Sequence, residues 1–160
     1  MSVINAMPEF QRHAERNRRR PPHLVKPLSA CAPRSTARSL TVHQLSFEGP
    51  DGYSSAGGLG VRVTGLANAL ATGVATDLYF VGDPDLPAVE QRYNVTLRRW
   101  CQHISRRARA GVYDAEEDKI ADLCAWWPAH VADRVHADAA AGIHTIVLAE
   151  DWHTVWPLIG

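Results

Sequence analysis

The sequence Ser55-Ala56-Gly57-Gly58-Leu59-Gly60 joins an apolar segment to an amphipathic one. Residues 40–47, before it, have the composition of a buried strand. After it, apolar residues recur at helical spacing, at Val63, Leu66, Ala67 and Leu70. A strand, a glycine turn and a helix N-terminus together direct unpaired N–H groups and the positive end of the helix dipole at one loop. The pattern therefore predicts an anion-binding loop suited to a phosphate-bearing ligand, such as a nucleotide or a sugar phosphate.

The segments that follow continue this pattern as an α/β fold. The first helix is predicted over residues 59–72, with Gly73 as its stop, and a second strand over residues 75–81. Strand, helix and strand in close succession form a βαβ unit, which implies a parallel sheet and a right-handed crossover. A further short strand is predicted at residues 95–100.

The second half of the domain is predicted to add a long helical segment and one more buried strand. Apolar spacing indicates helix from residue 114 to Gly142, and Pro128 within it either breaks or kinks this helix or begins a second one. Residues 145–149 are predicted to form the strand. Residues 150–154 follow at its carboxyl end, where ligands bind in open α/β sheets.

Two motifs resemble the N-terminal domain of the GT-B glycosyltransferases of the glycogen synthase, starch synthase and sucrose synthase kind. The sequence SAGGLGVRVTGLANALA, residues 55–71, is similar to their first glycine loop and first helix. The sequence Ala149-Glu150-Asp151-Trp152-His153-Thr154 is similar to their later Asp-Trp-His signature. The resemblance extends over residues 40–160. It implies that residues 39–160 are an incomplete Rossmann-like domain with a parallel sheet, truncated before the C-terminal domain that supplies most nucleotide-sugar contacts.

The resemblance also implies an activity, the transfer of a sugar from a nucleotide sugar to a carbohydrate acceptor with retention at the anomeric carbon. The residue matching His153 contacts the transferred sugar in that family, so His153 and its neighbour Asp151 are the predicted catalytic residues. The predicted donor- and acceptor-binding residues are Gly57, Gly58, Gly60 and Glu48. The family uses no metal and no cofactor apart from the donor substrate. Without the C-terminal domain, the chain alone is expected to be inactive.

The sequence departs from the glycogen synthase branch of the family at two places. Bacterial glycogen and starch synthases carry a lysine two residues before the double glycine, where this chain has Ser55. The glycogen synthase signature has histidines before its Asp, where this chain has residues 148–150, Leu-Ala-Glu. Both departures disfavour ADP-glucose-dependent glycogen synthesis and favour other hexosyltransferases of this fold.

Two other functions remain open. A dinucleotide-binding oxidoreductase domain would need the pattern G-x-G-x-x-G, but Val63 stands in place of the third glycine. The loop before the glycines is also long for that fold, although Asp83 follows the second strand near the ribose-binding position. The third function is that of a truncated, non-enzymatic remnant, which has the same ancestry as the glycosyltransferase but no turnover.

Each candidate residue also has a purely structural interpretation. The glycines could form a tight turn. Glu48 and Asp51, in the loop facing the cleft, could bind acceptor hydroxyls, but a role as turn residues is favoured. Asp151 could cap a helix, beside a packed Trp152 and an incidental surface His153. The basic segment from Arg98 to Arg109 could contact phosphate, but a solvated surface is favoured. Tyr113-Asp114 could mark a second loop of the cleft. Three tryptophans could stack on a sugar ring, but a place in the core or in a contact between domains is favoured for them: Trp126, Trp127 and Trp156.

Composition restricts the partners and the compartment. The net charge is zero, but residues 1–38 carry +6 and the remaining residues −6. The first 38 residues are predicted to be a disordered basic tail, in preference to a nucleic-acid or lipid contact. Neither a membrane span nor a secretion signal is predicted, and the three cysteines suggest neither a disulfide framework nor a zinc site. These features predict a cytoplasmic protein whose partners are a nucleotide sugar and a carbohydrate acceptor.

Overall fold

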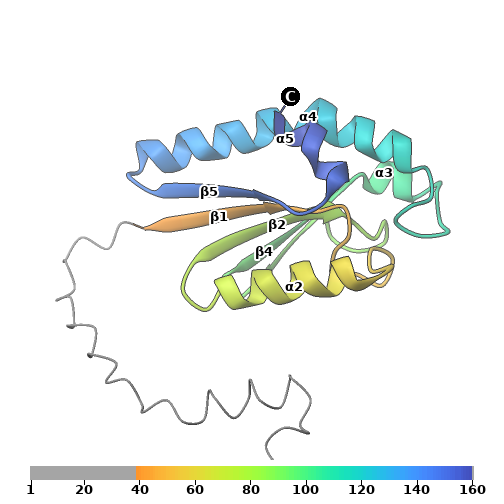
Figure 1. Ribbon diagram of the computed structural model, residues 1–160, viewed down its shortest axis with the longest axis horizontal. Coiled ribbons are helices and arrows are strands. Elements are labelled where there is room, and N and C mark those ends of the chain that lie inside the picture. The colour runs from red at the N-terminus through yellow and green to blue at the C-terminus, as the bar shows by residue number, and fades with distance from the viewer. Residues whose placement is uncertain (1–38, 160) are drawn as a thin grey trace, which may run out of the picture. The chain divides into compact units, whose positions relative to one another are not determined.

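A computed structural model of the chain describes residues 39–159. The predicted tail, residues 1–38, lies outside these residues, as does Cys31. The described part is an α/β domain with one five-stranded sheet, in the strand order β3-β4-β2-β1-β5 (Figure 1). The strands are β1 (Leu40–Leu45), β2 (Ala75–Val81), β3 (Val89–Arg92), β4 (Val95–Trp100) and β5 (His144–Ala149). The helices are α2 (Gly58–Leu70), α3 (Gln102–Ser105), α4 (Glu116–Ala140) and α5 (Val155–Ile159), with a 3₁₀ turn η2 (Trp152–Thr154) before α5.

The sheet is mostly parallel, as the βαβ pattern predicts. Strand β1 pairs in parallel with β2 and β5, and β2 pairs in parallel with β4. The structure adds β3, a short antiparallel strand paired with β4, which the sequence pattern did not predict. Its sequence, Val-Glu-Gln-Arg, has no apolar run to identify it, and it sits at the edge of the sheet. This arrangement is compatible with a Rossmann-like fold.

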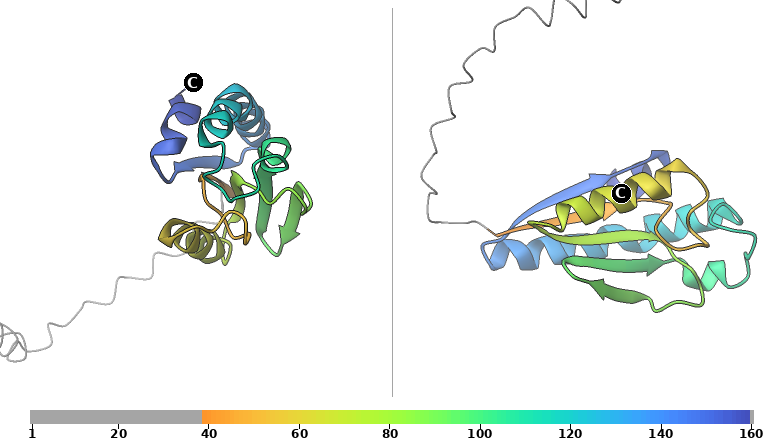
Figure 2. Two further views of the ribbon diagram at one scale, coloured as in Figure 1. Left: turned by 90° about the vertical axis from the view of Figure 1, so that its right-hand side faces the viewer. Right: turned by 90° about the horizontal axis from the view of Figure 1, so that it is seen from below.

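The two long helices, α2 and α4, cover opposite faces of the sheet, as Figure 1 and the end-on view in the left panel of Figure 2 show. The side chains of β2 alternate between two apolar clusters, as expected of a strand buried on both faces. Leu78 and Phe80 pack with Ala67 of α2, whereas Tyr79 and Val81 pack with Trp127 of α4. The central strand β2 therefore contributes to the apolar packing on both faces of the sheet.

Helix α4 resolves the alternatives that Pro128 left open, because it runs as one helix from Glu116 to Ala140 with the proline inside it. Proline lacks the N–H that would bond the carbonyl four residues earlier, so other contacts must hold the two halves together. Leu123, Trp127 and Val131 are buried against the sheet on both sides of the proline. The helix ends before Gly142, whose φ of 74° is the left-handed conformation typical of a helix stop.

Two expectations about burial in the strands of the sheet are wrong. Strand β5 was expected to be buried, but it lies at the edge of the sheet and leaves Ile146 44% exposed. The first arginines of the basic segment are not solvated. Arg99 is buried and pairs with Asp51 and Glu90, and Arg98 pairs with Asp77. Within residues 39–159, no helix is both long enough and apolar enough to cross a membrane.

Candidate functional site

The predicted site residues lie at the carboxyl edge of the sheet, where β1 and β5 run side by side. Glu48 follows β1 by three residues, and Asp151 follows β5 by two. The chain leaves β1 through α2 toward β2, and it returns through α4 to β5 on the other side of β1. The point between β1 and β5 is thus a topological switch point, the place where open α/β sheets bind ligands.

The glycine loop, residues 55–60, is placed as predicted at the N-terminus of α2. Gly57 is the N-cap, the helix begins at Gly58, and Gly60 lies in its first turn. The N–H groups of Ala56, Gly57 and Gly60 all donate to Oε2 of Glu48, over 3.3, 3.0 and 2.9 Å. The amides assigned to a phosphate by the sequence pattern therefore bind a carboxylate of the chain itself.

Of the three glycines, Gly60 is the one that this arrangement requires. A Cβ at position 60 would lie 3.0 Å from the carbonyl oxygen of Gly49 and 3.1 Å from Oε2 of Glu48. At Gly58 an added Cβ would meet nothing within 4 Å, and at Gly57 it would make only an ordinary contact of 3.7 Å. The absence of a side chain at Gly60 lets the helix backbone approach the Glu48 carboxylate closely.

Tyr113 holds the other oxygen of the Glu48 carboxylate. Its hydroxyl donates to Oε1 over 2.6 Å, from a loop 65 residues further along the chain. Burial raises the pKa of Glu48, but the hydrogen bonds from Tyr113, Gly60, Gly57 and Ala56 outweigh it and lower this pKa below its ordinary value. Burial, followed by the bond to Glu48, raises the pKa of Tyr113. Glu48 is therefore a buried, ionised acceptor and not a solvated turn residue.

Asp151 organises the loop after β5. Its Oδ1 accepts hydrogen bonds from the backbone N–H of His153 over 2.8 Å and contacts ring Nδ1 of the same residue at 3.0 Å. Its Oδ2 accepts from the N–H of Phe47 over 3.0 Å, which ties this loop to the end of β1. Asp151 also forms a capping box with Thr154 around the turn η2. The capping interpretation of Asp151 is thus confirmed, together with a contact to the predicted histidine.

His153 is buried, so its interpretation as an incidental surface residue is wrong. Its ring is 4% exposed and lies between two aromatic rings, with centroids 3.8 Å from Trp152 and 4.2 Å from Phe47. Ring Nε2 contacts Oε1 of Glu116 at 2.6 Å, while Nδ1 faces Asp151. Both ring nitrogens donate at once only when the imidazole carries two protons.

Sequence reasoning missed Glu116 altogether. It stands at the first position of α4, 37 residues before His153, and acidic residues at a helix start are common for reasons of the helix dipole. Tyr113 was noted as part of a possible second loop, and the structure places it against Glu48. We refer to Glu48, Tyr113, Glu116, Asp151 and His153 as the carboxylate–histidine cluster.

The side chains that are exposed around the cluster are not the predicted site residues. Trp152 is 63% exposed, and Tyr113 and Glu116 are partly exposed, whereas Glu48 and His153 are buried beneath them. An incoming ligand would meet the indole, the phenol and one carboxylate first. These groups offer an apolar ring face beside hydrogen-bonding partners.

The nearby charges are already paired. The cluster contains three carboxyl groups. Arg62 of α2 is held by Glu150, with Nη1 to Oε2 at 2.7 Å and Nη2 to the backbone carbonyl at 2.9 Å. Asp51 does not join the cluster, because it is buried against Arg99 and accepts from the N–H of Asp83. Within residues 39–159, no group of three or more His, Cys, Asp or Glu side chains has the arrangement of a metal site.

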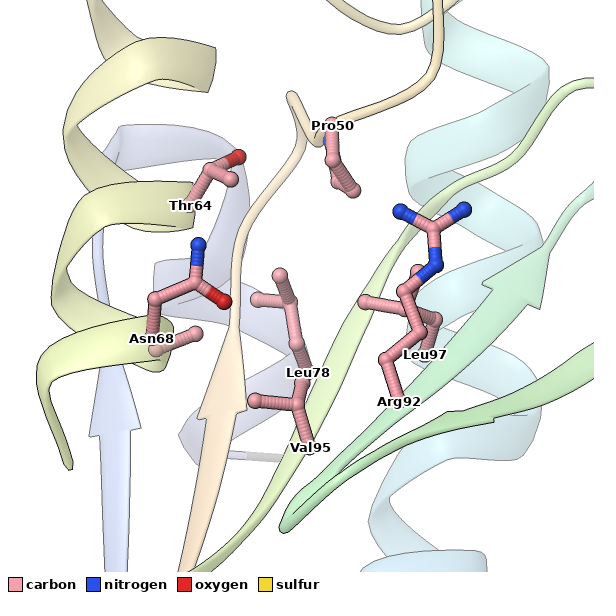
Figure 3. Close-up of a pocket in the computed structure, with 8 residues that line it drawn as sticks. Pro50, Thr64, Asn68, Leu78, Arg92, Val95 and Leu97 are labelled. Carbon is pink, nitrogen blue, oxygen red and sulfur yellow. The ribbon is translucent and has the colours of Figure 1, made fainter. Parts of the chain in front are cut away.

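A cavity on the α2 face of the sheet lies apart from the cluster (Figure 3). Its volume is about 40 Å³, and none of the predicted site residues lines it. Its walls are formed by Pro50, Thr64, Ala67, Asn68, Leu78, Arg92, Val95 and Leu97. A space of this volume suits about one or two water molecules and is too small for a sugar or a nucleotide.

Comparison with known proteins identifies no relative. No protein-family model, no curated protein and no solved structure matches the chain.

Proposed function

We propose that the described domain is the carbohydrate-binding part of a retaining glycosyltransferase, which transfers a sugar from a nucleotide sugar to a carbohydrate acceptor. The observation that carries the proposal is the position of His153, held between Asp151 and Glu116 at the topological switch point. The resemblance of the glycine loop and of the Asp-Trp-His motif to GT-B enzymes gives independent support.

The chemistry of this arrangement suits a sugar. Asp151 fixes the orientation of the His153 ring through Nδ1, so Nε2 is the nitrogen that a ligand would use. A sugar hydroxyl that replaced Glu116 at Nε2 would form a hydrogen bond with an oriented ring nitrogen, and Glu116 would become free to accept from a neighbouring hydroxyl. The exposed face of Trp152 offers apolar contact for the C–H groups of a sugar ring.

Turnover would require groups beyond this cluster. A leaving nucleoside diphosphate needs positive charge or free N–H donors aimed at it. Here the glycine-loop amides bind Glu48, and Arg62 is paired with Glu150. We therefore propose that a second domain stabilises the donor diphosphate, without metal or cofactor, and that the chain alone does not transfer sugar.

The same contacts disfavour a dinucleotide-binding oxidoreductase. Pyrophosphate would need the N–H groups of Gly57 and Gly60, and both donate to Glu48. Val63, in the place of the third glycine of the fingerprint, is fully buried against the sheet. The non-enzymatic remnant has the same cluster and is separated from the enzyme only by an activity measurement.

Two measurements test the proposal. In the first, ¹H–¹⁵N spectra of the purified chain are recorded with a panel of monosaccharides, short oligosaccharides and NADH. We expect a sugar to shift the signals of Trp152 and His153, and we expect His153→Ala to abolish the shifts. The matched control is His103→Ala, which removes an exposed imidazole on α3. Loss of sugar binding in both variants, or binding of NADH alone, contradicts the proposed site.

The second measurement is nucleoside diphosphate release from a panel of nucleotide sugars, using the chain alone. We expect no steady release. Steady release that disappears in His153→Ala would show that the chain is an enzyme by itself and would overturn the requirement for a second domain.

A further inference from the structure

The glycine loop is already occupied by an anion that belongs to the protein. A helix N-terminus preceded by a glycine turn is ordinarily open to phosphate, because its first N–H groups have no partner. In this chain the amides of Ala56, Gly57 and Gly60 converge on one oxygen of Glu48. Glu48 is 3% exposed, and the other oxygen of its carboxylate is held by Tyr113.

The surroundings fix the carboxylate in this place. Gly60 leaves room for it, since a Cβ there would lie 3.1 Å from Oε2. Tyr113 holds it from the opposite side, and its ring packs at 5.7 Å from both Phe47 and His153. A phosphate that entered the loop would have to expel Glu48 from its four hydrogen bonds and leave a buried charge without partners.

The nearby charges give phosphate no compensation. The carboxyl groups of Asp151 and Glu116 contact the two ring nitrogens of His153. The ring of His153 is 5.7 Å from that of Tyr113, so these carboxyl groups are near the loop. Arg62, in the first turns of α2, is engaged by Glu150 through two hydrogen bonds. The loop thus presents a filled anion site beside further carboxylates.

We propose that Glu48 is a specificity-determining residue, which keeps phosphate out of the glycine loop and restricts the cluster to uncharged, hydroxyl-bearing ligands. This inference rests on the proposed function and names the ligand class of the same site. The glycines then serve to position an acceptor for ligand hydroxyls, with Tyr113 as the group that a ligand would replace at Oε1 of Glu48.

The test is a titration with inorganic phosphate, followed through the amide signals of residues 56, 57 and 60. The full chain is compared with Glu48→Gln and Glu48→Ala. Glutamine keeps the shape and one acceptor oxygen, so this variant retains the fold if the alanine variant does not. We expect no shift in the unaltered chain, and an affinity for phosphate at these amides at least about tenfold higher in the variants.

The control is Glu117→Gln, which removes the same charge from an exposed residue of α4 and should leave the loop signals unchanged. Two results overturn the inference. One is a shift of the loop amides by phosphate in the unaltered chain at the concentrations that shift the variants. The other is failure of phosphate to shift these amides in a folded Glu48→Gln chain.

Sugar binding is measured separately on the signals of Trp152 and His153, so the two proposals fail in different ways. If the unaltered chain binds sugar at Trp152 and also phosphate at the loop, the proposed role of Glu48 is refuted and the proposed function is not. A chain that excludes phosphate until Glu48 is replaced, but binds no sugar, supports the exclusion and refutes the proposed function.

Discussion

The substitution Gly60→Ala tests the packing of the helix start against Glu48. The new Cβ would lie 3.0 Å from the Gly49 carbonyl, 3.1 Å from Oε2 of Glu48 and 3.2 Å from Oγ of Ser55. The Gly49 carbonyl belongs to the backbone and can shift little, whereas the Glu48 carboxylate ends a side chain and can withdraw. Losing one charge-assisted hydrogen bond costs about 1.5–3 kcal/mol of unfolding free energy.

The matched control is Gly65→Ala in the same helix. Gly65 is exposed, and a Cβ there would meet nothing within 4 Å. Alanine gains about 1 kcal/mol over glycine in a helix interior, and to a first approximation both variants receive this gain. The difference between the two unfolding free energies therefore reports the crowding of the new Cβ against Glu48 and the Gly49 carbonyl, and we expect Gly60→Ala to be less stable by about 1.5–3 kcal/mol.

The assay is urea unfolding of both variants at neutral pH, followed by circular dichroism. A second pair of measurements places Gly60→Ala in a Glu48→Ala background. If the alanine acts by displacing the carboxylate, most of its effect should vanish there, as a coupling between neighbours. Equal stability of Gly60→Ala and Gly65→Ala, or an undiminished effect without Glu48, would refute the reasoning.

Three further predictions concern the core and the charges. Burial lowers the pKa of His43 from 6.5, so the folded state binds fewer protons than the unfolded one. The unfolding free energy should fall as the pH drops below about 6.5, and His43→Gln should flatten this decline in a urea series. Arg99→Met should destabilise the fold by about 3–5 kcal/mol because it strands Asp51, and addition of Asp51→Leu should recover part of this loss. Trp127→Ala should cost about 3–5 kcal/mol, whereas Trp126→Ala, which removes an exposed ring, should change stability by only about 0.5 kcal/mol.

Each of these predictions has a contrary outcome. A stability profile that stays flat between neutral pH and pH 5 would show that His43 titrates alike in both states. An Arg99→Met chain as stable as the original would mean that Asp51 finds another partner. Equal effects of the two tryptophan substitutions would contradict the packing of α4.

Several elements could be read from the sequence because their signals are local. The strands at residues 75–81 and 95–100 match the structure, and α2 begins within one residue of its predicted start. Their periodicity depends only on which side chains neighbour each other along the chain. The common location of Glu48 and Asp151 was also accessible, because loops after parallel strands emerge at the same edge of the sheet.

Other features were decided only by the folded chain. The sequence assigned the glycine-loop amides to an external phosphate, since nothing in the local pattern shows that Glu48 turns back onto them. Its second partner, Tyr113, is 65 residues away, and the partner of His153, Glu116, is 37 residues away. The order of residues along the chain does not show which side chains so far apart come into contact.

The sequence by itself determines the path of the backbone elements, whereas the partners of the buried polar side chains depend on tertiary packing. Local composition fixes where strands, turns and helices begin, because steric preference and hydrophobic periodicity act over a few residues. Whether a helix N-terminus stays open or is filled depends on which carboxylate packing brings within about 3 Å of it. In this protein that carboxylate is Glu48, and the close approach of the chain at Gly60 is what admits it.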